Sequence, residues 1–107
     1  MCSASKLVKN MLEELKSKKE ELLHDVTLYD RQVSKLYHEF ESADLTLESG
    51  IQLAKKMQGV LRERRGVKYD LMQYKTLITT LDTALRRLAA NEKEYFKDNE
   101  NYKQYIS

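Results

Sequence analysis

The residues of this chain best suited to bind a metal ion are two histidines and their acidic neighbours. His24 and His38 lie fourteen positions apart, which is about 21 Å along a single helix, so they cannot share one ion. Glu20 with His24, and His38 with Glu39 or Glu41, have helical spacing for a ligand pair, but such pairs arise often in charged helices. The sequence therefore predicts no metal site and no cofactor.

Covalent catalysis has no recognisable motif in this sequence. Cys2 is the only cysteine and lies at the terminus, where an incidental thiol is the ordinary interpretation. There is no nucleophile elbow, no phosphate loop and no HExxH pattern. We therefore expect a protein that is not an enzyme, with a subunit that completes an active site only in a complex as the weaker alternative.

Positive charge is concentrated in the second half of the chain. Residues 55–87 carry nine Lys or Arg against three acids, although the net charge of the whole chain is only +2. A basic helix face can neutralise phosphates, and the candidate residues for this are Lys55, Lys56, Arg62, Arg65 and Lys68. An acidic first half would lie alongside, so a solvated or protein-binding face is favoured and nucleic-acid binding is the alternative.

Two apolar seams at heptad spacing indicate the elements that position these residues. The first seam, with steps of four and three, consists of Val8, Leu12, Leu15, Lys19, Leu22, Val26, Tyr29, Val33, Leu36 and Phe40. The second consists of Leu53, Met57, Val60, Arg64, Val67, Leu71, Tyr74, Ile78, Leu81, Leu85 and Leu88. Such seams are typical of helices that pack against each other as a coiled coil.

The chain has no Pro, and its potential helix caps cluster between the two seams. Ser3 or Ser5 can cap a first helix, and Asp44 or Thr46 can cap a second. We predict a single all-α domain with a helix over 4–42, a turn over 43–46, a helix over 47–90 and an aromatic tail over 91–107. The fold is a long antiparallel helical hairpin with a C-terminal helical extension, packed into a helical-bundle oligomer.

A fold-back at residues 43–46 predicts which charges face each other. Arg64 would lie opposite Asp25, and Lys19 opposite Asp70. Each cation that interrupts a seam would then meet an acid on the other helix. We expect these pairs to fix the register, because an unpaired charge in a seam is unfavourable.

The end of the chain is the predicted contact surface for a partner or for other copies. In this register Leu85 and Leu88 extend past the reach of the first helix. Further aromatic residues follow at Tyr95, Phe96, Tyr102 and Tyr105. This end is either a fraying terminus or a docking segment. A second apolar row beside each seam would also stay exposed, which favours self-association.

The segments 37–41, 47–58 and 61–68 resemble the middle of small helical proteins carried by phages and prophages of Gram-positive bacteria. The resemblance implies a host-cell cytoplasm and a takeover or anti-defence role exerted by contact with a host protein, with no catalytic residue. The residues independently lack a membrane-length apolar run and a signal-peptide core. Together they predict a cytoplasmic protein-interaction module that binds itself and a protein target, without a membrane partner.

Overall fold

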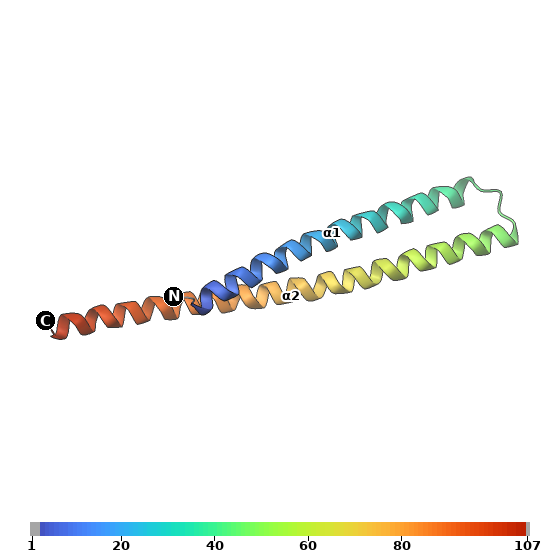
Figure 1. Ribbon diagram of the computed structural model, residues 1–107. Helices are drawn as coiled ribbons and strands as arrows, with labels where there is room; N and C mark the ends of the chain where they lie inside the picture. The colour runs from blue at the N-terminus through green and yellow to red at the C-terminus, as the bar shows by residue number, and fades with distance from the viewer. Residues whose placement is uncertain (1–2, 107) are drawn as a thin grey trace. The chain divides into compact units, whose positions relative to one another are not determined.

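The computed structural model describes the backbone of residues 3–106 and the side chains of residues 3–98. Two helices, α1 (Ala4–Ser42) and α2 (Leu47–Ile106), pack antiparallel as a hairpin (Figure 1). The described residues contain no strand. The predicted all-α hairpin is therefore confirmed, and α1 has the bounds that the sequence indicated.

Serine and threonine side chains cap the N-termini of both helices. The backbone N–H of Lys6 donates to Oγ of Ser3 over 3.2 Å, which makes Ser3 the cap of α1. At α2, the N–H of Ser49 donates to Oγ1 of Thr46 over 3.1 Å, and the N–H of Thr46 donates back to Oγ of Ser49 over 2.9 Å. This reciprocal arrangement is a capping box with serine in the position usually taken by Glu or Gln.

The second helix continues beyond residue 90, where the sequence prediction ended it, and runs to Ile106. Three asparagines after residue 90 led to that prediction because asparagine lowers helix propensity. No Gly or Pro follows Gly66, however, and extending an existing helix is far easier than nucleating one. The helix therefore propagates through the segment that was predicted to be a separate tail.

Two compact units divide the hairpin, one formed by residues 18–74 and the other by the two terminal segments. Each unit has its core at the predicted seams. Leu22 and Leu71 are buried in the first unit, and Leu12 and Ile78 are buried in the second. The remaining seam positions are half-buried, except for the exposed Phe40. The heptad pattern thus identified the buried face of both helices.

Candidate interaction surfaces

An ion pair joins the two helices within the unit of residues 18–74. Nε of Arg64 lies 2.6 Å from Oδ1 of Asp30, and the two side chains are 30% and 52% exposed. The sequence had predicted Asp25 as the partner of Arg64. That prediction is wrong, because the acid that contacts Arg64 lies five positions closer to the turn along α1.

The direction of helical side chains explains this difference. A Cβ in a helix tilts toward the N-terminus of its own helix. Arg64 therefore leans toward the turn, where α2 begins, while Asp30 leans away from the turn, toward the start of α1. A register derived from the fold-back alone omits both displacements. Arg64 therefore contacts an acid closer to the turn than the fold-back count predicts.

The second predicted ion pair, Lys19 with Asp70, is not formed among the described residues. Lys19 is half-buried at its seam position and Asp70 is exposed. The long aliphatic stem of a lysine can line an apolar seam while its ammonium group reaches water. Lys19 can therefore occupy the seam without an acid opposite it.

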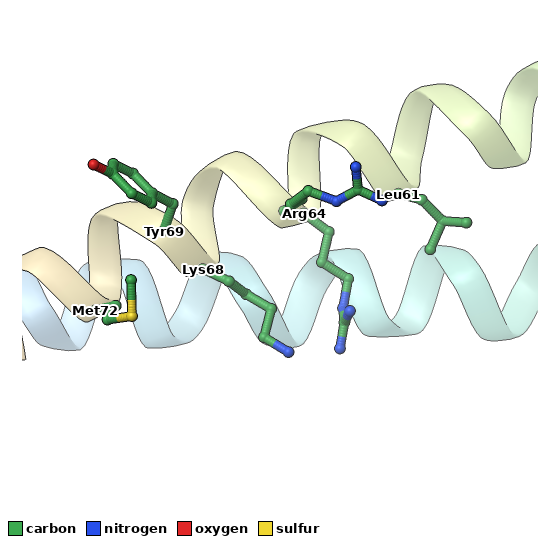
Figure 2. Close-up of a pocket in the computed structure, with 6 residues that line it drawn as sticks. Leu61, Arg64, Lys68, Tyr69 and Met72 are labelled. Atoms are coloured by element: carbon green, nitrogen blue, oxygen red, sulfur yellow. The ribbon is translucent and has the colours of Figure 1, made fainter.

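A shallow hollow on α2 gathers positive charge around apolar side chains. Its lining residues share one side of the helix over three turns, and they are Leu61, Arg64, Arg65, Lys68, Tyr69 and Met72 (Figure 2). Leu61 is 39% exposed and Met72 is 54% exposed. Apolar surface framed by cations is suited to a partner that carries both apolar and acidic groups.

The five residues of the predicted basic patch do not form one surface. All five are exposed, but only Arg65 and Lys68 line the hollow. Lys56 precedes Arg65 by nine positions, which rotates the two about 180° apart around the helix. Lys55 and Arg62 likewise lie outside the hollow. The positive charge of residues 55–68 is therefore spread around α2. Among the five predicted residues, Arg65 and Lys68 are the ones that lie beside exposed apolar side chains.

Acidic groups surround Tyr29 in the same unit. Partial burial raises the pKa of Tyr29, and the carboxylate of Glu63 raises it further by its charge and by a side-chain hydrogen bond. Asp25 also raises this pKa by its charge. Asp25 lies one turn before Tyr29 on α1, and Glu63 of α2 hydrogen-bonds to the phenol, so the two acids come to Tyr29 from different helices.

Near the turn, the last part of α1 and the first part of α2 form a small apolar hollow. The residues that line it are Leu36, Tyr37, Phe40, Leu53, Ala54 and Met57. Phe40 ends the first seam and is 49% exposed. This seam position was predicted to be buried against the other helix, and it lies in the open hollow instead.

The predicted contact residues at the end of α2 divide into two groups. Leu85 and Leu88 are half-buried, and α1 reaches past them, since Oγ of Ser5 donates to Oε1 of Glu92 over 2.6 Å. The expectation that these leucines lie beyond the first helix is therefore wrong. The cause is again the lean of helical side chains, since Ser5 leans away from the turn and Glu92 leans toward it, which the fold-back count omits.

Tyr95 and Phe96 form the second group and remain open. They are 61% and 64% exposed, and their rings meet edge to face with centroids 5.8 Å apart. Together with Ser3 they line a hollow. Figure 1 shows that α2 continues past the start of α1. The side chains of Tyr102 and Tyr105 lie outside the described residues, so their predicted contact role stays a prediction.

Neither a metal cluster nor a membrane span occurs in the described part of the chain. No three His, Cys, Asp or Glu side chains come together there as an ion site. Among the described side chains, one acid lies within ion-pair distance of His38, namely Glu41, with Nδ1 4.0 Å from Oε2. Over the same residues, neither helix contains a stretch long and apolar enough to cross a bilayer.

Comparison with protein-family models, with curated proteins and with solved structures finds no match to this chain.

Proposed function

We propose that this chain is a non-enzymatic helical interaction module that associates with itself and binds a protein target. The observation that carries the proposal is the amount of apolar surface left open by the hairpin. Among the described residues only four hydrophobic side chains are buried, whereas fourteen large hydrophobic side chains are exposed. The exposed side chains lie on both helices, and protein interfaces commonly cover apolar groups of this kind.

The resemblance of residues 37–68 to phage and prophage proteins indicates the kind of target. It supports a role as a modulator or inhibitor of a host or defence protein in the cytoplasm of a bacterium. Inhibition by contact requires an exposed surface and no catalytic group, and the open apolar residues on both helices satisfy that requirement. Leu61 and Met72 on α2, and Tyr95 and Phe96 further along it, are the residues we propose for contact.

Two measurements on the full chain test this proposal. Light scattering over a concentration series should give a mass above that of the monomer. Affinity capture from a bacterial lysate should retain a protein, and the variant Leu61→Ser/Met72→Ser should lose it. The control Leu47→Ser removes an apolar side chain that is 84% exposed at the first position of α2, away from the hollow. A chain that stays monomeric and retains nothing more than this control would contradict the proposal.

A further inference from the structure

The unit of residues 18–74 has an acidic side and a basic side, and three consecutive residues of α2 indicate where they lie. Arg64 occupies the seam and is half-buried, while Glu63 before it and Arg65 after it are exposed. Each helical residue turns about 100° from the last, so Glu63 and Arg65 flank the seam on opposite sides. An acid and a base therefore stand on the two faces that the hairpin presents.

The basic side continues from Arg65 along α2. Lys68 follows it in the same hollow, with Leu61 and Met72 providing the apolar part. Asp30 of α1 reaches this side but is bound by Arg64. Within the described residues neither Arg65 nor Lys68 forms an ion pair, so two cations beside exposed apolar groups remain available to a partner.

The acidic side contains residues of both helices. Asp25 precedes Tyr29 by one turn of α1, and Glu63 of α2 forms a side-chain hydrogen bond with the same phenol, so both acids lie beside Tyr29. Asp70 follows Glu63 by one heptad and lies on the same side of α2. Leu28, 40% exposed and one turn after Asp25, supplies apolar surface there.

Cations are few on the acidic side. Lys56 lies one heptad before Glu63, toward the turn. Lys18 is bound by Glu21, with Nζ 3.3 Å from Oε2. The group of Asp25, Glu63 and Asp70 thus presents negative charge beside an open leucine.

We infer that the basic side of one copy docks on the acidic side of a second copy. The two sides are complementary in charge, and each carries exposed apolar groups that the other would cover. The inference rests on the proposed function and names the first partner of that module as another molecule of the same chain. Since the two sides are different surfaces on opposite faces, the contact is heterologous and association continues beyond a dimer as concentration rises.

A polyanion such as nucleic acid is the competing occupant of the basic side. Nucleic-acid binding proteins commonly neutralise several phosphates with a row of cations. Here the free cations of the hollow are Arg65 and Lys68, and the rest of its open lining is Leu61, Tyr69 and Met72. The chain's own acidic side matches this mixture of two charges and apolar surface better than a phosphate backbone does.

Charge reversal tests the inference on the full chain. The variant Arg65→Glu/Lys68→Glu is acidic on both sides, and the variant Glu63→Lys/Asp70→Lys is basic on both sides. Each repels its own copies, so we expect self-association at low salt to weaken by about tenfold or more in either variant alone. An equimolar mixture should recover association, because the reversed side of each variant then meets a complementary side of the other.

The control Arg31→Glu/Lys35→Glu makes the same charge change at two exposed positions of α1, away from the hollow. It should associate like the natural chain. Circular dichroism confirms that every variant stays helical, and light scattering gives the masses. Recovery in the mixture supports the inference, because non-specific repulsion would not be relieved in this way.

Other outcomes would overturn the inference that the basic side of one copy docks on the acidic side of another. If the natural chain associates and the reversed variants do so equally well, this contact is wrong although the proposed function stands. If the mixture fails to recover while Arg65→Glu/Lys68→Glu abolishes a salt-dependent binding to duplex DNA, the basic side serves nucleic acid. If the natural chain is monomeric and captures no protein, the proposed function fails with it.

Discussion

Arg64 of the second seam is bound to Asp30, which lies just outside the first seam, through a contact of 2.6 Å. A cation at a seam position loses part of its hydration, and this acid compensates for that loss from the facing helix. Because both side chains are partly exposed, the pair contributes alignment more than stability. It distinguishes the observed register from one displaced by a heptad, where Arg64 would meet no such partner.

A double-mutant cycle measures this pair. The variants Asp30→Asn and Arg64→Gln, alone and combined, should give a coupling free energy of about 0.5 kcal/mol in urea unfolding. The matched cycle of Asp25→Asn with Arg64→Gln should give a coupling close to zero. A larger coupling to Asp25 than to Asp30 would contradict the register described above.

Thr46, which caps α2 at the turn, should contribute more to stability than an exposed threonine inside the helix. Replacing Thr46 by Ala removes the acceptor for the N–H of Ser49 and should lower the free energy of unfolding by about 1 kcal/mol. Thr79→Ala is the control, since that hydroxyl only bonds the carbonyl of Lys75 within α2. Thr79→Ala should leave stability unchanged or raise it slightly. Equal losses in thermal unfolding would show that the cap is not formed.

The hairpin could be predicted from the sequence because its information is local. The seams repeat over many turns, and Ser3 and Thr46 mark the two helix starts with side chains that cap. Buried positions such as Leu22 and Leu71 followed directly from the same repeat. Periodicity reports which face of a helix is buried, so these features required no knowledge of the partner helix.

The contacts across the hairpin could not be predicted in the same way. The partner of Arg64 depends on the lean of two side chains, which the residue count around the turn does not contain. The same omission misplaced Leu85 and Leu88 relative to α1. The acidic and basic sides could have been predicted from the consecutive residues Glu63, Arg64 and Arg65. That prediction requires knowing which positions flank the seam.

A substitution at Gly66 tests whether another copy of the chain packs against this part of α2. Gly66 lies inside the helix without a positive φ, and a Cβ added there meets nothing within 4 Å. Gly66→Ala should therefore raise the free energy of unfolding by about 0.5 to 1 kcal/mol. Gly59→Ala, with the same open surroundings, should behave alike. A loss of stability that grows with protein concentration would show that another copy packs closely on these glycines.

Tyr29 reports the acidic side through its ionisation. Partial burial and then the charge of Glu63 hold its pKa above the ordinary value, so the folded chain favours the neutral phenol. The stability linked to this shift is complete below the ordinary tyrosine pKa and is lost as pH rises through the raised pKa of the folded state. Unfolding in urea from about pH 9 to about pH 11 should therefore show a decline that Tyr29→Phe reduces.

Removing the charge of Glu63 should lower the pKa of Tyr29 toward its ordinary value. The comparison is an absorbance titration of tyrosinate in Glu63→Gln and in the natural chain, with Tyr29→Phe to assign the signal. Glu41→Gln is the control, because Glu41 is not among the groups that shift this phenol. If the pKa of Tyr29 is unchanged in Glu63→Gln, Glu63 does not lie beside this phenol together with Asp25. The acidic side proposed to receive a second copy would then lose one of its three carboxylates.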